Sequence, residues 1–278
     1  MMKFLALIFF SLQVPALAYV CSSKSYTTSV RENLNIHQIK MSSSSSDDEV
    51  RIVGPALQSV AMKTKRLFLV RHGEVINPGG DRSVYYGSQD VELSTLGKQE
   101  ATAAGEYLQQ FNLQLVASSP LSRAVFGAKE ILSLQSNEKD LTISVEPGFT
   151  ELDRGAWRGK TKGEIGLDLL QRFDACDLAV TPEGGESYPE LKERVIGARD
   201  RILSMIEFEK SAAIVSHLQV TRSMLSEAMG IPASSMASLK VLTASVTCID
   251  YHEDGTQTVQ FQSFKPNVGL DQAKDGAN

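Results

Sequence analysis

Two histidines, two arginines and a glutamate in this chain could together bind and transfer a phosphoryl group. Such a group carries about -1.5 to -2 charges near neutral pH, and Arg71 and Arg123 offer planar guanidinium groups that fit its oxygens. His72 can attack phosphorus, because an imidazole of ordinary pKa is only partly protonated near neutral pH. His217 can donate a hydrogen bond to the same group, and the Glu151 carboxyl can protonate the leaving oxygen. No metal is expected, because the arginines and imidazoles supply the positive charge.

Each of these side chains follows a segment that the sequence predicts to be a β-strand. His72 comes directly after an apolar run, Arg123 and Glu151 come shortly after two others, and His217 follows a fourth. Ligands bind beyond the carboxyl ends of strands in a parallel sheet, so one pocket could collect all of them. The predicted strands are Arg66–Val70, Leu113–Ser118, Thr142–Glu146, Ala212–Ser216, Val246–Tyr251 and Thr258–Phe264.

Helical segments alternate with these strands. Leu96–Gln109 and Leu121–Leu134 repeat apolar residues at helical spacing. Ser187 with Glu190, and Thr161 with Glu164, are typical of capping boxes at helix starts. The last two strands flank Glu253-Asp254-Gly255, which predicts a hairpin turn. The fold class expected is α/β: a three-layer α/β/α sandwich with a mostly parallel sheet, closed by an antiparallel hairpin.

The motifs around these residues resemble the signatures of the histidine phosphatase superfamily, the phosphoglycerate mutase-like group. The resemblance runs from about Arg66 to about Phe264 and favours the phosphatase branch, since the piece after the predicted proton donor is short. It implies His72 as the phosphorylated nucleophile, Glu151 as proton donor and His217 as the other catalytic imidazole. It also implies Arg71, Arg123 and His217 as phosphate ligands. The matching pieces, in family order, are Arg71–Glu74, Ser118–Ala124, Glu151–Gly159, and Val215–His217 with Arg222.

The chain departs from the family pattern at a few positions near the expected pocket. An Asn usually found four residues after the signature Glu is here Asn77, three residues after it, and we include it among the phosphate ligands. The usual Gly-Gly after the second histidine is Leu218-Gln219, so Leu218 is expected to narrow the pocket. Arg158 stands where an acidic residue is common, which favours a more anionic substrate.

The resemblance implies a metal-independent phosphomonoesterase, needing no cofactor, that hydrolyses a small phosphorylated metabolite through a phosphohistidine intermediate. Two alternatives stay open. A cofactor-dependent phosphoglycerate mutase uses the same pocket but returns the phosphoryl group to a sugar acid. A non-catalytic phosphate-binding relative keeps the fold and loses the activity, usually with loss of the signature His or Arg.

The composition of the chain argues against several classes of binding partner. A net charge of -5 over 278 residues gives no general attraction for nucleic acid. The three cysteines are far apart in sequence and suggest neither a disulfide framework nor a metal cluster. No segment after the N-terminal one has the length of about 18 apolar residues that spanning a membrane needs, so no membrane partner is expected for the mature form. The sequence carries no signal of the oligomeric state.

The N-terminal region predicts targeting rather than fold. Residues 1–18 have the charged start, apolar run and small-x-small end of a signal peptide. Residues 19–62 are rich in Ser and Thr and resemble a transit-like disordered segment. Together they predict delivery to a plastid through the secretory pathway, with secretion as the alternative. We expect the catalytic domain at residues 63–266 and a tail at 267–278.

Overall fold

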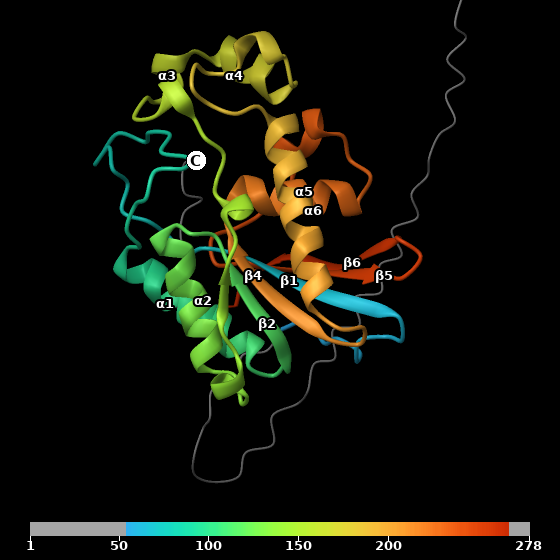
Figure 1. The fold of residues 1–278 in the computed structure, drawn as a ribbon. Coiled ribbons are helices and arrows are strands. Elements are labelled where there is room, and N and C mark those ends of the chain that lie inside the picture. The colour runs from blue at the N-terminus through green and yellow to red at the C-terminus, as the bar shows by residue number, and fades with distance from the viewer. Residues whose placement is uncertain (1–53, 267–278) are drawn as a thin grey trace, which may run out of the picture. The chain divides into compact units, whose positions relative to one another are not determined.

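A six-stranded sheet organises residues 54–266, the part of the chain that the computed structural model describes (Figure 1). The strand order is β3-β2-β4-β1-β5-β6. The first four strands in this order are mutually parallel, whereas β5 runs antiparallel to both β1 and β6. The mostly parallel sheet with an antiparallel hairpin is therefore confirmed. The strands are β1 (Thr64–Arg71), β2 (Leu113–Ser118), β3 (Ile143–Val145), β4 (Ser211–Ser216), β5 (Val246–His252) and β6 (Gln257–Phe264).

Alternating side chains of the central strands fill two separate cores. On β1, Leu67 and Leu69 belong to one core, while Phe68 and Val70 belong to the other, as the two-residue period of a strand requires. Helices α5 and α6 cover the first face of the sheet, and α1 and α2 cover the second (Figure 1). Because both faces are covered, the central strands are apolar throughout, which is typical of a parallel sheet. The three-layer sandwich is confirmed.

The helices begin where the sequence carries capping residues. Ser187 and Glu190 form a complete capping box at the start of α5, and Thr161 and Glu164 form another at α3. Ser94, the N-cap of α1, accepts a hydrogen bond from the Gly97 amide. The α-helices are α1 (Thr95–Leu108), α2 (Ser122–Ser133), α3 (Lys162–Ile165), α4 (Leu167–Asp174), α5 (Tyr188–Met205) and α6 (Leu218–Ala228). The 3-10 helices are η1 (Glu138–Asp140), η2 (Pro147–Phe149), η3 (Gly155–Trp157), η4 (Leu178–Val180) and η5 (Ala233–Ser238).

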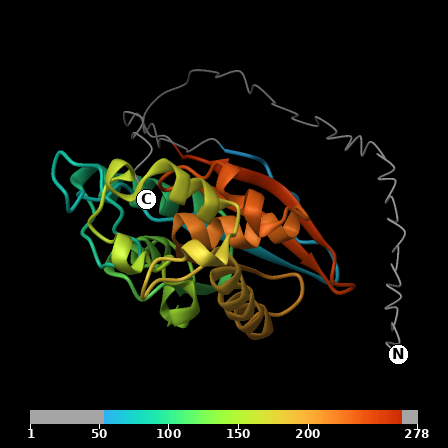
Figure 2. The ribbon, with the colours of Figure 1, turned by 90° about the horizontal axis from the view of Figure 1, so that it is seen from above.

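The segment from α3 to η4 stands apart from the two helical layers. Figure 2 views the sheet with α3 and α4 nearest the reader. Helix α4 buries Leu170 and Phe173, and Phe173 packs between Trp157 and Tyr188 with ring centroids 5.2 and 4.8 Å away. This aromatic stack joins the insert to the loop after Glu151 and to the start of α5.

The packed part of the domain begins before the boundary expected at Lys63. The Tyr107 hydroxyl donates to the Pro55 carbonyl at 3.3 Å, and Arg66 donates to the Gln58 carbonyl at 2.8 Å. Leu57 packs against the core that α1 and α2 cover. Residues 54–62 therefore do not share the disordered character expected of residues 19–62. The predicted signal peptide, most of the transit-like segment and the C-terminal tail lie outside the described residues. Within residues 54–266, no helix combines the length and hydropathy needed to cross a bilayer.

Candidate active site

His72 lies immediately beyond β1, and its ring is held in one tautomer. Its amide donates to the Ser216 carbonyl at 2.9 Å, which ties the end of β1 to the end of β4. The ring Nδ1 lies 2.7 Å from the Gly73 carbonyl oxygen. Because a carbonyl only accepts, Nδ1 carries the proton and Nε2 keeps its lone pair. Nε2 is buried and has no hydrogen-bond partner among the described residues. This is the arrangement that a nitrogen nucleophile needs.

Gly73 fixes how the loop after β1 approaches helix α1. A Cβ placed on Gly73 would lie 2.1 Å from the Gly97 carbonyl oxygen, and one on Gly97 would lie 1.9 Å from the Glu74 carbonyl oxygen. The loop and the first turn of α1 therefore touch backbone to backbone, which only glycine allows. The glycine of the Arg-His-Gly motif thus positions His72 by permitting this close contact.

His217 lies beside His72 at the N-cap of α6. The two ring centroids are 5.1 Å apart with an interplanar angle of 60°. His217 Nε2 lies 2.7 Å from the Ser119 hydroxyl oxygen, while its Nδ1 is buried without a partner among the described residues. Strand register explains the meeting, because Ser118 pairs with Val215 and Arg71 pairs with Ser216. The carboxyl ends of β1, β2 and β4 therefore deliver their side chains to one place.

Both imidazoles are uncharged near neutral pH. Burial holds the pKa of His72 well below its ordinary value, and the Arg123 and Arg71 charges lower it further. The pKa of His217 is also held well below its ordinary value, first by burial and then by Arg123. A neutral imidazole has the lone pair that attack on phosphorus requires. The electrostatics of the site therefore agree with the tautomer that Gly73 selects.

Arg123 is a buried cation held by backbone carbonyls rather than by a carboxylate. The side chain is 1% exposed, and it donates to the Gln89 carbonyl at 2.8 Å and to the Gly87 carbonyl at 3.0 Å. The nearest carboxylate oxygen, on Asp90, lies 3.9 Å away and is half exposed. A buried cation without close countercharge favours binding of an anion. Arg71, at the end of β1, donates to the Val241 carbonyl at 2.8 Å and is also buried.

Glu151 is buried and attached to the first turn of α6. Its carboxylate accepts from the Leu152 amide at 2.7 Å and from the Gln219 amide at 3.3 Å. The second bond joins it to the helix whose N-cap is His217. Tyr86, which the motifs do not contain, lies near the acid and the cations. Burial raises the pKa of its hydroxyl, the Arg71 and Arg123 charges lower it, and the Glu151 charge raises it. Tyr86 is buried, and Arg123 lies 5.4 Å from its ring centroid. No pattern in the sequence distinguished it.

Asn77 is occupied within its own loop. Its side-chain amide donates to the Arg82 carbonyl at 2.8 Å and accepts from the Gly79 amide at 3.0 Å. These bonds close a turn over residues 77–82. A phosphate contact from Asn77 would break this turn, so the structure gives no support to that assignment. Arg158 is also engaged elsewhere, in an exposed ion pair with Asp153 at 2.7 Å.

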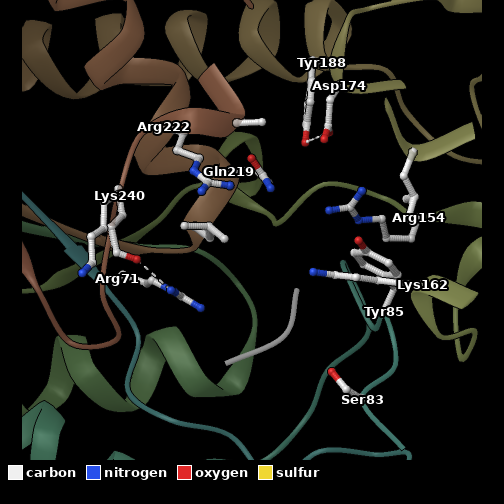
Figure 3. Close-up of a pocket in the computed structure, with 14 residues that line it drawn as sticks. Arg71, Ser83, Tyr85, Arg154, Lys162, Asp174, Tyr188, Gln219, Arg222 and Lys240 are labelled. Carbon is white, nitrogen blue, oxygen red and sulfur yellow. Dashed lines mark hydrogen bonds between the residues drawn. The ribbon is translucent and has the colours of Figure 1, made fainter. Parts of the chain in front are cut away.

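A cavity of about 520 Å³ opens above Arg71 (Figure 3). Leu218 lines it, as the departure from the glycine pair suggested, and so does Gln219. Arg158 does not line it, but Arg154 from the same loop does. Among residues 54–266, the lining side chains are Arg71, Ser83, Tyr85, Arg154, Lys162, Leu170, Asp174, Tyr188, Leu218, Gln219, Arg222, Ala237, Lys240 and Val241.

A paired-histidine anion site at the strand ends of an α/β sandwich defines a class of phosphate-handling proteins. The chain belongs to the histidine phosphatase superfamily (branch 1), whose family model matches residues 67–263. The resemblance drawn from the motifs is thereby confirmed.

Several relatives and solved structures are similar to this chain. Phosphoserine phosphatase 1 of Hydrogenobacter thermophilus is 30% identical over 192 residues, which cover 68% of this chain and 87% of that protein. A bifunctional protein of Mycobacterium tuberculosis is 29% identical over 198 residues, or 70% of this chain and 52% of the relative, so the chain spans about half of that protein. A mycobacterial glucosyl-3-phosphoglycerate phosphatase in complex with VO3 is 27% identical, with a TM-score of 0.61 over 72% of this chain and 98% of that one.

Proposed function

We propose that this protein is a phosphatase that hydrolyses a small phosphate monoester through a phosphohistidine at His72. The His72 Nε2 lone pair forms a bond to phosphorus as the ester P–O bond breaks, and Glu151 gives its proton to the departing oxygen. Water then attacks the phosphohistidine, the P–N bond breaks, and the proton of the water passes to Glu151. Arg71, Arg123 and His217 hold the phosphoryl oxygens throughout. This scheme uses no metal and no cofactor.

The environment of His72 Nε2 carries the proposal. This nitrogen is buried, unprotonated by virtue of the Nδ1–Gly73 bond, and without a partner among the described residues. Burial and the two arginines keep the ring neutral. The named phosphatases among the relatives support the same activity.

The test is phosphate release from p-nitrophenyl phosphate by the parent protein and by His72→Ala. We expect the variant to lose at least about 1000-fold in kcat, because the nucleophile is removed outright. Rapid quenching should trap an acid-labile, base-stable phosphoryl group on the parent and none on the variant. His252→Gln is a matched control, since His252 lies on the β5–β6 hairpin and contacts Thr64 and Thr258 instead of the site. Equal phosphate release by His72→Ala and the parent would overturn the mechanism.

The purified parent protein can also be tested for the two alternative functions, a phosphoglycerate mutase and a non-catalytic phosphate-binding protein. Supplied with 3-phosphoglycerate and 2,3-bisphosphoglycerate, a mutase forms 2-phosphoglycerate without free phosphate, whereas a phosphatase releases phosphate. A non-catalytic relative binds phosphate and turns over neither substrate. Relatives of both classes exist, since a probable phosphoglycerate mutase of Yersinia pestis is 27% identical over 192 residues.

A further inference from the structure

The cavity above Arg71 contains more positive charge than one phosphoryl group requires. Within the described part of the chain, five of its lining side chains are basic and one is acidic. Arg71 is among the phosphate ligands, and Arg123 accompanies it from outside the lining. A phosphoryl group of about two negative charges is therefore matched by these two arginines. Four further cations, Arg154, Lys162, Arg222 and Lys240, surround the remaining space.

Arg154 is the most constrained of the four. It is 4% exposed, and its guanidinium stacks 4.5 Å from the Tyr85 ring centroid and 5.7 Å from that of Phe173. No hydrogen bond or ion pair joins its guanidinium to another group in the described part of the chain. Stacking orients the planar group without using its in-plane donors. Those donors are available to a ligand in the cavity that Arg154 lines.

Gly87 couples Arg154 to the phosphate site. Its carbonyl accepts the bond from Arg123, and its backbone has a positive φ of 48°. A Cβ there would lie 2.7 Å from Arg154 Cγ. One glycine thus holds Arg123 through its carbonyl and lets Arg154 pack against its α-carbon. The same short stretch of backbone therefore contacts both arginines.

Arg222 approaches the cavity from the opposite side, on α6. Its Nε donates to the Leu239 carbonyl at 2.7 Å, which leaves its terminal nitrogens directed into the cavity (Figure 3). Burial lowers the pKa of Arg222, and the nearby Arg71 charge lowers it further. Asp174, the one acidic side chain that the described residues contribute to the lining, accepts a hydrogen bond from the Tyr188 hydroxyl at 3.0 Å.

Gln219 adds a polar group to the same cavity. It occupies the first turn of α6, is 2% exposed, and lines the cavity beside Arg222 (Figure 3). Its side-chain oxygen has no hydrogen-bond partner among the described residues. A buried carbonyl oxygen without a donor is energetically unfavourable. A substrate hydroxyl or N–H group next to the second anion would satisfy it.

We infer that the substrate carries a second acidic group, bound by Arg222 and Arg154, in addition to the phosphoryl group transferred to His72. The substrate class is a phosphate monoester of a hydroxy acid, or of a molecule with a second phosphate, with a hydrogen-bond donor facing Gln219. Lys162 and Lys240 stand exposed at the cavity rim, where they attract the dianionic molecule. This inference rests on the proposed phosphatase function and concerns its specificity.

The test compares pairs of substrates that differ in one acidic group. Glycerol 3-phosphate and 3-phosphoglycerate differ only in a CH₂OH against a carboxylate. Fructose 6-phosphate and fructose 1,6-bisphosphate provide the arm for a second phosphate. We expect kcat/KM to favour the acidic member of at least one pair by about tenfold or more, the effect of one charge-assisted hydrogen bond.

Variants assign the preference to the residues. Arg222→Gln and Arg154→Met should each reduce the acid-to-neutral ratio of kcat/KM about tenfold, and Arg222→Lys should restore part of it. Arg154→Met keeps the aliphatic packing against Tyr85. Arg201→Gln is a matched control. Arg201 lies on α5 and forms an exposed ion pair with Glu146, and neither residue is among those that line the cavity.

The outcomes are separable. A ratio near one in the parent, or equal loss on both members of a pair in Arg222→Gln and Arg154→Met, overturns the second-anion site while phosphatase activity stands. Failure to release phosphate from p-nitrophenyl phosphate overturns the proposed function and the specificity inference with it. A preference that disappears in both arginine variants and persists in Arg201→Gln supports the inference.

Discussion

Replacing Arg123 by methionine should weaken phosphate binding strongly and leave the stability of the domain nearly unchanged. The guanidinium is buried with two carbonyl acceptors, and its nearest carboxylate oxygen is 3.9 Å away. Removing it leaves the buried Gly87 carbonyl without its donor, which costs roughly 1–3 kcal/mol. It also removes an uncompensated buried cation, which returns several kcal/mol of desolvation, by order of magnitude. These terms offset each other, so we expect the free energy of unfolding to change by less than about 2 kcal/mol.

The effect on binding has no such compensation. Loss of one charge-assisted hydrogen bond to phosphate costs about 1.5–3 kcal/mol, or roughly 10- to 200-fold in Kd. Phosphate at 100 times its Kd stabilises the parent by about 2.7 kcal/mol, a rise in Tm of about 5–11 °C for a domain of this size. At the same phosphate concentration, Arg123→Met should show at most about half of that rise. The assay is thermal melting with and without phosphate, together with p-nitrophenyl phosphate turnover.

Arg66 provides the matched control for this prediction. It is also a buried arginine, but two of its donor nitrogens reach the Asp250 carboxylate, at 2.7 and 2.8 Å. Arg66→Met strands the Asp250 carboxylate in the core and should cost about 3–5 kcal/mol of stability. If Arg123→Met destabilised the protein as much as Arg66→Met, or kept the full phosphate-induced rise in Tm, the reasoning that Arg123 is kept for ligand binding would be refuted.

Three further predictions concern other parts of the molecule. Because burial holds the pKa of His72 and His217 below the ordinary value, the unfolded chain binds more protons than the folded one below about pH 6.5. Their contribution to stability is present above that pH and is lost as pH falls, so Tm should drop from about pH 7 to pH 5, and less so in the His72→Gln, His217→Gln double variant. Gly97→Ala should cost about 1–3 kcal/mol of unfolding free energy in urea, because its Cβ would lie 1.9 Å from the Glu74 carbonyl oxygen. Gly197→Ala in α5 should be neutral or stabilising in the same assay, because its Cβ would meet only the flexible end of the Arg201 side chain, at 3.7 Å. If the protein is delivered to a plastid, N-terminal sequencing of the mature protein should find its first residue after Tyr19 and before Thr64. A mature protein that begins at Tyr19 would favour secretion.

The sequence predicted the site where local signals were sufficient. His72 and His217 each follow a short apolar run that favours a buried strand, and parallel register then aligns the strand ends. The caps at Ser187 and Thr161 depend on contacts three residues apart, which the sequence displays directly. The roles of these residues in catalysis stay predictions, although the structure brings His72, His217, Arg71, Arg123 and Glu151 together.

The sequence could not predict contacts that depend on the path of a loop. Asn77 has the right residue type near the right motif, yet its amide closes a turn with Arg82 and Gly79. The carbonyls of Gly87 and Gln89 position Arg123 from more than thirty residues away, and a backbone carbonyl leaves no mark in sequence. Helix α4 is too short for its periodicity to stand out, although its apolar side chains anchor the insert.

Arg154 and Arg158 show most clearly why a charge has to be judged by its partner. Both lie in one short loop, and the sequence favoured Arg158 as the residue attracting a more anionic substrate. Between them, Gly155 turns the chain at a φ of 46°, where a Cβ would lie 2.3 Å from the Glu183 carbonyl oxygen. Beyond this turn Arg158 reaches solvent and pairs with Asp153, and such an exposed pair has little charge left to offer a ligand. Arg154 instead stacks on Tyr85 inside the cavity lining, with no carboxylate among its contacts in residues 54–266. The buried cation without a countercharge is the one that a substrate can neutralise, and this selects Arg154 over Arg158 for the second anion.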